Sequence, residues 1–262
     1  MDGFENYYNN ELKTPYVINQ EEFIEKIKND ERFIFVKYGD GEFYCMNNLI
    51  GANCDNDTYC QKLNNGLIES FYNLLEISNN ENVYIGKWHN LEIVRFYLAL
   101  CYIKYQNTST KIPFVDYRIC LPYFHYNENH NIFNIVKYIQ KSKRYKIVIS
   151  NDNNTYHKHI FKGDIFIEVP KNSWFINGYY DSIYNKIRDV IKEHPYALIL
   201  ISAGMGSKVI ATNLFLEFKE ISIIDVGSAF DLLSQKKATR DYHLNYDELY
   251  DYFKPLLEYQ IL

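Results

Sequence analysis

The sequence lacks the patterns of a membrane protein, a disulfide-rich protein and a nucleic-acid-binding protein. No segment approaches the ~18 consecutive apolar residues of a membrane-spanning helix. The five cysteines are odd in number and include no C-x-x-C pair, which argues against a zinc ribbon and against a disulfide scaffold. Runs of Lys and Arg are short and the formal net charge is −5, so the basic surface that grips a polyanionic backbone is missing. We therefore expect no membrane span and no nucleic-acid partner.

Several enzyme signatures and all signs of chain division are missing too. The sequence has no G-x-S-x-G elbow, no Walker A loop and no H-E-x-x-H helix, so hydrolase, P-loop and zincin functions lose their main support. No Pro-, Gly- or Ser-rich linker and no internal repeat occurs. The first residues carry no apolar run of the signal-peptide kind, and we expect a cytoplasmic protein. A single domain is expected over 1–262, with its core at about 20–235 and a C-terminal helical extension at 240–262.

Strand and helix patterns alternate along the chain. The apolar fraction of 47% and the charged fraction of 23% are those of an ordinary globular protein. Short runs rich in β-branched and aromatic residues predict strands near 32–39, 82–88, 112–119, 146–150, 165–170, 197–202 and 221–227. Apolar residues at helical spacing predict helices near 20–29, 58–77, 91–105, 178–193, 206–218 and 246–258.

The strands at 146–150 and 197–202 are continuous apolar runs, which is typical of parallel strands covered on both faces. Together with the alternation, they predict an α/β fold with a Rossmann-like, mostly parallel, doubly wound sheet flanked by helices. In such a sheet, ligands bind where loops follow the carboxyl ends of the strands. The polar loops after strands are therefore the first places to look for chemistry.

The loop after the first strand carries two carboxylates. Asp40 and Glu42 are separated by one residue, and Gly39 and Gly41 leave the backbone free to turn both side chains toward one cation. A D-x-E pair of this kind suits Mg²⁺ or Mn²⁺ that also binds a diphosphate. The structural alternative is that Asp-Gly is an ordinary turn and Glu42 begins a helix, where an acid favours the helix dipole.

A glycine turn follows the strand at 197–202. Gly204 and Gly206 allow close approach of the backbone, and a helix that starts near Ser207 favours a phosphate. Val209 stands where the dinucleotide fingerprint requires Gly or Ala, so the pattern indicates a nucleotide more than NAD. Asp225 ends the next strand, near where a ribose-binding acid would lie. A tight turn without a ligand is the alternative.

Other polar residues follow strands as well. Asn151 opens an Asx-rich loop, a composition that ordinary turns share. A reaction that removes a proton from its substrate would also need a general base. Asp152, His89 and Asp116 are the candidates, and the sequence does not choose among them.

Three motifs, in chain order, resemble those of the bacterial GT-D-fold glycosyltransferases, a family formerly known as a domain of unknown function. They are YGDGE at 38–42, VPKNSW at 169–174, and the glycine turn and helix of 201–214 followed by IDVG at 224–227. The resemblance extends over about 30–235. It implies a Rossmann-like fold, a UDP-sugar donor, Mn²⁺ or Mg²⁺ as cofactor, and Asp40 and Glu42 as the catalytic, metal-binding pair.

The resemblance also directs attention to residues around the sugar nucleotide. We expect that group to consist of Lys37, Tyr38, Gly39, Gly41, Asn151, Asn172, Gly204, Gly206, Ser207 and Asp225. The chain departs from the family at Lys37, where an Arg is common, and at 228–231, where a His and an acid often follow. Lys keeps the positive charge but lacks the bidentate fork of Arg.

The leading hypothesis is a metal-dependent glycosyltransferase that moves a hexose from a UDP-sugar to a glycan or glycoprotein acceptor. Two alternatives stay open. One is a Rossmann-type methyltransferase that uses S-adenosylmethionine, with the Gly204 turn and Asp225 as its ligands, although that glycine loop normally follows the first strand. The other is a sugar-nucleotide-binding module without catalytic activity.

Overall fold

A computed structural model describes residues 20–46, 60–78, 82–87, 114–116, 119, 132–151, 156–170, 175 and 178–231, and the fold and site below are those of these residues. The strands are β1 (Ile34–Tyr38), β2 (Val83–Lys87), β3 (Phe114–Asp116), β4 (Lys146–Ser150), β5 (Ile165–Glu168), β6 (Leu198–Ser202) and β7 (Ser222–Asp225). The helices are α2 (Gln20–Lys28), α3 (Asp40–Met46), α4 (Gln61–Ile77), α6 (Ile132–Lys141), α7 (Tyr156–Phe161), α8 (Tyr180–Glu193) and α9 (Gly206–Glu217), followed by the 3₁₀ turn η3 (Gly227–Phe230).

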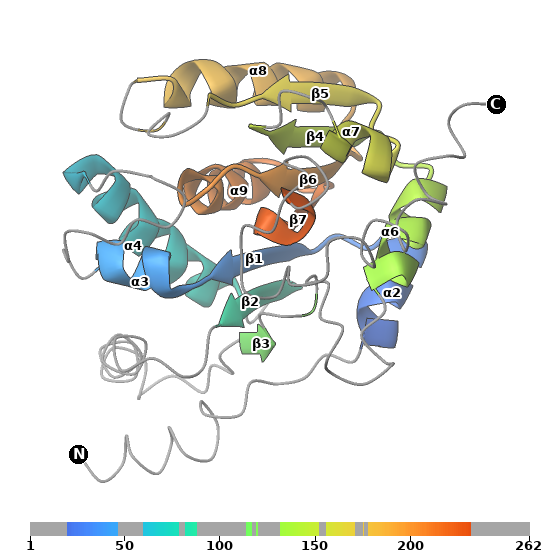
Figure 1. Ribbon diagram of the computed structural model, residues 1–262, viewed down its shortest axis with the longest axis horizontal. Coiled ribbons are helices and arrows are strands. Elements are labelled where there is room, and N and C mark those ends of the chain that lie inside the picture. Colours follow the sequence, from blue (N-terminus) through green and yellow to red (C-terminus); the bar gives the residue numbers. More distant parts are fainter. Residues whose placement is uncertain are drawn as a thin grey trace, which may run out of the picture.

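The described strands form one seven-stranded sheet in the order β3-β2-β1-β7-β6-β4-β5, and every neighbouring pair is parallel (Figure 1). The last strand of the sequence, β7, lies in the middle, between β1 and β6. All residues of β1, β4, β6 and β7 are buried, as expected for strands covered on both faces. The predicted parallel α/β sheet is confirmed.

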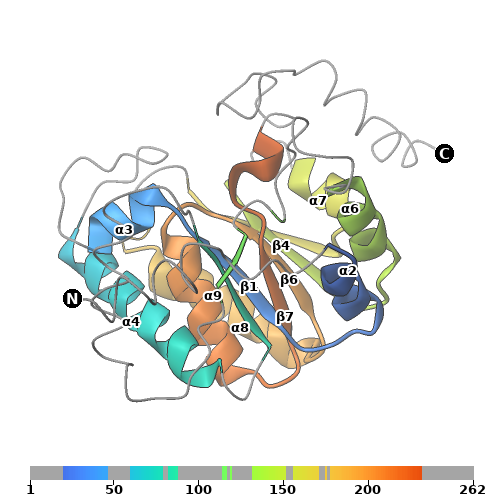
Figure 2. The same ribbon diagram turned by 90° about the horizontal axis from the view of Figure 1, so that it is seen from below.

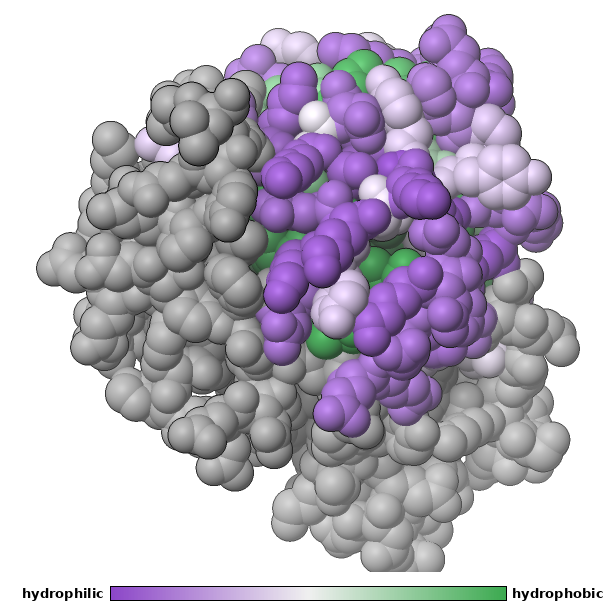
Figure 3. All heavy atoms as spheres, turned by 90° about the vertical axis from the view of Figure 1, so that its right-hand side faces the viewer, coloured by the Kyte–Doolittle hydropathy of each residue, from purple (hydrophilic) through white to green (hydrophobic). Residues whose placement is uncertain are grey.

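Each face of the sheet has its own apolar core. Helices α3, α4, α8 and α9 pack on one face and α2, α6, α7 and η3 on the other (Figure 2). In β1, Ile34 and Val36 point to the first core, while Phe35 points to the second. This period of two is what a pleated strand imposes. Viewed from the right-hand side of Figure 1, the described surface is mainly hydrophilic (Figure 3).

The connections explain where the site lies. The connections from β1 to β2, from β5 to β6 and from β6 to β7 each lead toward the β3 edge of the sheet. They run over the face that carries α4, α8 and α9. Crossovers that step toward β5 use α6 and α7 on the other face, as a single crossover hand requires. After β7 the chain passes to η3 on the second face, whereas β1 and β6 lead into α3 and α9 on the first. The loops thus diverge at the carboxyl end of β7, where such sheets bind ligands.

Helix α9 is buried almost all round, because it packs over β1, β6 and β7 and against α4. A helix in such a position is apolar on most sides. Its first turn is consequently held at the carboxyl edge of the central strands. Among the described helices, none combines the length and apolar character needed to cross a bilayer.

At the opposite, amino edge, the buried guanidinium of Arg144 ties several segments together. It donates to the carbonyls of Tyr196 (2.7 Å), Glu31 (3.2 Å) and Glu220, and to the hydroxyl of Ser222 (2.6 Å). Burial lowers the pKa of Arg144 from its ordinary value, and nearby acids oppose that effect. The planar fork of Arg suits several acceptors at once.

Predicted and observed elements differ mainly at their ends. The strand expected at 112–119 is described only as Phe114–Asp116, and α3 corresponds to the alternative in which Glu42 lies in the first turn of a helix. Helices α6 and α7 were not predicted, although Ile132, Ile135, Val136 and Ile139 of α6 recur at helical spacing. The helices expected at 91–105 and 246–258, and the C-terminal extension at 240–262, lie outside the described residues.

Candidate functional site

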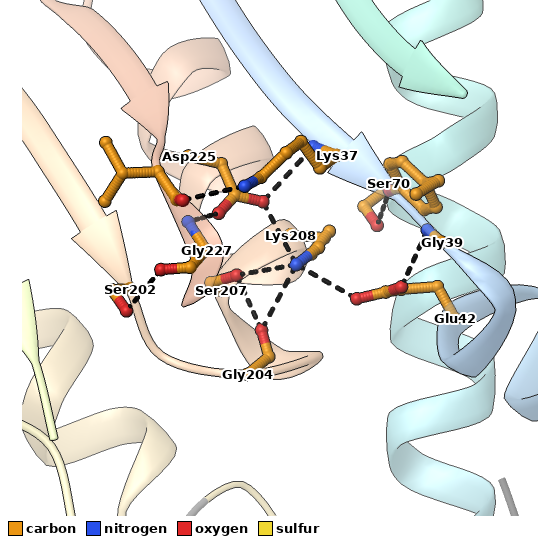
Figure 4. A network of polar contacts seen from close by, with 12 residues as sticks. Lys37, Gly39, Glu42, Ser70, Ser202, Gly204, Ser207, Lys208, Asp225 and Gly227 are labelled. Carbon is orange, nitrogen blue, oxygen red and sulfur yellow. Dashed lines mark hydrogen bonds and ion pairs between the residues drawn. The ribbon is translucent and has the colours of Figure 1, made fainter. Parts of the chain in front are cut away.

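Three turns meet at the carboxyl edge of the central strands. One follows β1 and contains Gly39 and Glu42, one follows β6 and leads from Gly204 to Lys208, and one follows β7 at Asp225. The order β1-β7-β6 across the sheet makes them neighbours. Figure 4 shows their side chains pointing toward one another.

The ammonium of Lys208 joins the three turns. Its Nζ lies 2.9 Å from Oε1 of Glu42 and 3.0 Å from Oδ2 of Asp225, and it donates to Oγ of Ser207 at 3.2 Å (Figure 4). Burial by itself lowers the pKa of Lys208, but the carboxylates of Asp225 and Glu42 outweigh burial and raise that pKa above its ordinary value. Lys208 is therefore a charged group in the buried part of the site.

Asp225 is fully engaged by the protein itself. Oδ1 accepts from the backbone N–H of Gly227 at 2.9 Å, while Oδ2 accepts from the backbone N–H of Lys37 at 3.2 Å as well as from Lys208. The side chain has no exposed surface. Asp225 therefore lies at the site as predicted, but its carboxylate holds β1, α9 and the β7 turn rather than facing a ribose.

Lys37 lies on the other face of the sheet from Lys208. Its Nζ donates to the carbonyl of Val226 at 2.7 Å, beneath the turn at Gly227. Gly227 has φ +49°, and a Cβ there would lie 2.5 Å from that Nζ. Only glycine fits this left-handed position so close to Lys37. The ammonium of Lys37, a residue expected around the sugar nucleotide, is thus packed against the backbone in this structure.

Tyr38 and Glu42 occupy different environments although they share one turn. The Tyr38 ring is fully buried and its hydroxyl lies 3.0 Å from Oγ of Ser70 on α4. Burial raises the pKa of Tyr38 above its ordinary value, so the hydroxyl stays neutral. Its side chain belongs to the core rather than to the sheet edge. Glu42, by contrast, accepts from the backbone N–H of Gly39 at 2.8 Å and reaches Lys208.

The glycine turn after β6 is closed by its own hydrogen bonds. Gly204 has φ +62°, and its carbonyl accepts from Oγ of Ser207 at 2.7 Å and from the backbone N–H of Ser207 at 3.2 Å. Gly206 and Ser207 are buried, whereas Gly204 is partly exposed. The predicted glycine turn and helix start are confirmed as structure, and their contact with a nucleotide stays a prediction.

Other predicted residues are placed only in part. Asn151 is half-buried and follows β4, next to β6 at the same edge. Asp116 ends β3, and Asp40 begins α3 directly after Gly39, but their side chains lie outside the described structure. Residues at 89, 152 and 172, predicted as His89, Asp152 and Asn172, also lie outside the described residues.

Lys208 was not predicted from the sequence as a site residue. The signal was present, because a Lys in the first turn of a helix after a strand and a glycine turn is a common arrangement around phosphates. The group predicted to surround the nucleotide ended at Ser207 in this turn, one position earlier.

The described residues fit a divalent cation that binds oxygen. Glu42 offers a carboxylate at the edge, and each of its oxygens accepts from one protein donor, which leaves lone pairs for a further bond. Mg²⁺ and Mn²⁺ need only one or two protein carboxylates when phosphates and waters complete the shell. Among the described residues, no group of three or more His, Cys, Asp or Glu gathers as a closed metal site.

Comparison with known proteins identifies the fold. No family model matches the sequence, and no curated protein matches it significantly. Two solved structures of domain of unknown function 1792 (DUF1792), one described as having a distinct glycosyltransferase fold, each align with a TM-score of 0.58 and 20% identity over 90% of this chain and 90% of theirs. The chain has the DUF1792 fold.

A further DUF1792 structure supports the same conclusion. It is described as a new glycosyltransferase from Streptococcus sanguinis, and it aligns with a TM-score of 0.55 and 16% identity over 89% of this chain and 93% of its own. At this identity the similarity establishes the fold. The GT-D fold expected from the sequence motifs is thereby confirmed for the DUF1792-like sheet described above.

Proposed function

We propose that this chain is a glycosyltransferase that moves a sugar from a UDP-sugar to a glycan or glycoprotein acceptor, with Mn²⁺ or Mg²⁺ bound at Asp40 and Glu42. The observation that carries the proposal is the ion pair between Lys208 and Glu42, since it joins the D-x-E turn of β1 to the glycine turn of β6. These two turns meet at the carboxyl edge of the sheet, where the loops leave for opposite faces. The fold of this sheet is shared with proteins described as glycosyltransferases.

The roles follow from the chemistry of each group. A divalent cation held by Asp40 and Glu42 would supply positive charge against the negative charge that develops on the diphosphate as its bond to the sugar breaks. Asp40 and Glu42 supply oxygen ligands for that cation, and Gly39 fixes Glu42 through its backbone N–H. Gly204, which is partly exposed, lets the backbone come close to the donor.

The acceptor reaction needs a second group. In an inverting transfer, the acceptor hydroxyl oxygen bonds to the anomeric carbon, the bond to the diphosphate breaks, and a base takes the hydroxyl proton. Asp152, His89 and Asp116 remain the candidates for that base. Asp116 ends a strand of the same parallel sheet, two strands away from β1.

The methyltransferase alternative loses support at Asp225. A ribose-binding acid must offer its carboxylate to a diol, but that of Asp225 is buried and accepts from Lys37, Lys208 and Gly227. The glycine turn also follows β6 rather than the first strand. The binding module without turnover remains an outcome of the experiment.

The test is calorimetric titration with UDP in Mn²⁺ and again in EDTA. We expect binding only with the metal, and binding weaker by about tenfold or more in Asp40→Ala and in Glu42→Gln. Asp189→Ala is the matched control, because Asp189 is an exposed carboxylate on α8 that pairs with Lys192 at 2.9 Å. Its titration should equal that of the wild type.

Three outcomes decide among the functions. Metal-dependent binding followed by UDP release from a UDP-sugar in the presence of an acceptor supports the transferase. Metal-dependent binding without transfer to any acceptor tested points to a binding module. Binding of S-adenosylmethionine without metal, and none of UDP, would overturn the proposal.

A further inference from the structure

Lys208 is a buried cation in direct contact with a proposed metal ligand, and the roles given to Asp40 and Glu42 do not use it. Its ammonium lies between Glu42 at 2.9 Å and Asp225 at 3.0 Å. Two carboxylates, the hydroxyl of Ser207 and the carbonyl of Gly204 at 3.4 Å are acceptors around the three donors of the ammonium. The position is therefore built for a cation.

Exposure falls along this chain of contacts, from 8% at Glu42 to 5% at Lys208 and 0% at Asp225. Glu42 is thus the member nearest the solvent, and the ammonium lies between it and the fully buried acid. Lys37, with its ammonium on the Val226 carbonyl, adds a second buried positive charge. Among the described side chains of this cluster, the two positive charges of Lys37 and Lys208 therefore face the two negative charges of Glu42 and Asp225 without any added ion.

A divalent cation held by Glu42 would share that carboxylate with the Lys208 ammonium. It would disturb this balance, because like charges repel strongly in a buried setting. A diphosphate restores the balance, since it brings negative charge and offers the ammonium a new anionic partner. Lys is well suited to this exchange, because its charge sits on a long flexible stem and binds phosphate as a point charge.

We propose that Lys208 makes metal binding at Glu42 conditional on the donor diphosphate. Its ammonium pairs with Glu42 in the ligand-free protein and with the diphosphate when metal and donor are bound. This inference rests on the proposed function. It means that metal and nucleotide bind together, each strengthening the other by the same factor, as linkage requires. Lys37 does not fill this role, since its ammonium points to the other face of the sheet.

The experiment measures Mn²⁺ binding to the whole protein with and without saturating UDP, by calorimetry and by the electron paramagnetic resonance signal of free Mn²⁺. In the wild type, UDP should tighten Mn²⁺ binding by about tenfold or more. In Lys208→Met, Mn²⁺ alone should bind more tightly than to the wild type, because the competing ammonium is gone, and the tightening by UDP should be markedly smaller.

Two further variants make the result decisive. The double variant Lys208→Met with Asp225→Asn removes one charge of each sign from the interior, so it tests the same effect if the single variant does not fold. Lys192→Met is the matched control, because Lys192 pairs with Asp189 at the same 2.9 Å but on the exposed surface. Lys192→Met should leave the Mn²⁺ affinity unchanged, both with and without UDP.

The outcomes separate this inference from the proposed function. If UDP tightens Mn²⁺ binding equally in the wild type and in a folded variant without Lys208, the role of Lys208 is wrong and the transferase proposal stands. If neither ligand affects the other in the wild type, the metal-dependent donor site itself is wrong, and this inference is overturned with it.

Discussion

Gly227 offers a test of how rigid the buried charge cluster is. Gly227→Ala should destabilise the protein for two reasons. The backbone is left-handed, with φ +49°, and a Cβ would lie 2.5 Å from Nζ and 2.8 Å from Cε of Lys37. The strain of a non-glycine residue in that region costs about 1–2 kcal/mol. Moving the Lys37 ammonium from the Val226 carbonyl adds about 1.5–3 kcal/mol, the usual value for a hydrogen bond to a charged group.

Substitutions at two other glycines measure the effect of backbone strain and the effect of a steric clash on stability separately. Gly178 has φ +80°, and a Cβ there would meet no atom within 4 Å, so Gly178→Ala should lose only the ~1–2 kcal/mol of backbone strain. Gly163 is not in the left-handed region, but a Cβ would lie 2.5 Å from Cγ2 of the buried Val148. Gly163→Ala should therefore lose about 1–3 kcal/mol from overpacking alone.

Urea denaturation gives the free energy of unfolding of all three variants. Gly227→Ala should be the least stable, at about 2.5–5 kcal/mol below the wild type. Adding Lys37→Met should recover part of that loss, because the shorter uncharged side chain leaves room for the methyl group, and a double-mutant cycle measures the coupling. A Gly227→Ala loss no larger than that of Gly178→Ala would refute the reasoning, since Lys37 would then move without cost.

The remaining predictions concern three other regions. Tyr38→Phe should lose about 1 kcal/mol of stability, measured in urea, and leave UDP affinity unchanged, because the hydroxyl bonds only within the core in the contacts described here. Arg144→Met should lose about 3 kcal/mol or more, because it removes the hydrogen bonds of a buried guanidinium to Tyr196, Glu220 and Ser222, and Arg144→Lys should recover only part of that. Burial alone would raise the pKa of Glu217, but hydrogen bonds from Arg188 and Tyr184 hold it below its ordinary value. The small stabilisation by Glu217 should thus be complete above pH ~4.3 and fade at lower pH. Thermal melts of Glu217→Gln should approach the wild type as the pH falls; a constant difference would count against the ion pair.

Local patterns were enough to predict much of the sheet. The strands β4 and β6 were predicted almost to the residue, since a continuous apolar run has few other stable positions in a folded chain. The turns at Gly39 and Gly204 were also located correctly, because glycine and the end of an apolar run mark a strand-to-loop boundary. Helix α6 was not predicted, although its apolar residues recur at helical spacing.

Side-chain partners were harder to predict than elements. Asp225 was predicted to bind a ribose from its place at a strand end, yet three donors of the protein itself surround it. Lys37 was expected among the residues around the sugar nucleotide, yet its ammonium donates to the carbonyl of Val226 beneath Gly227. In both cases the strand position was right, and the deciding contacts come from other segments of the chain, such as the turn after β7 and helix α9.

The sequence by itself determined the parallel α/β class, the turns that follow β1 and β6, and the D-x-E pair, because these depend on composition and spacing within a few residues. The tertiary structure alone decided that β7 lies between β1 and β6, which brings Lys37 and Asp225 together from positions 188 residues apart. Strand order depends on how all the helices cover both faces at once, and no local pattern encodes it. The Lys208 bridge between Glu42 and Asp225 exists only because of that order.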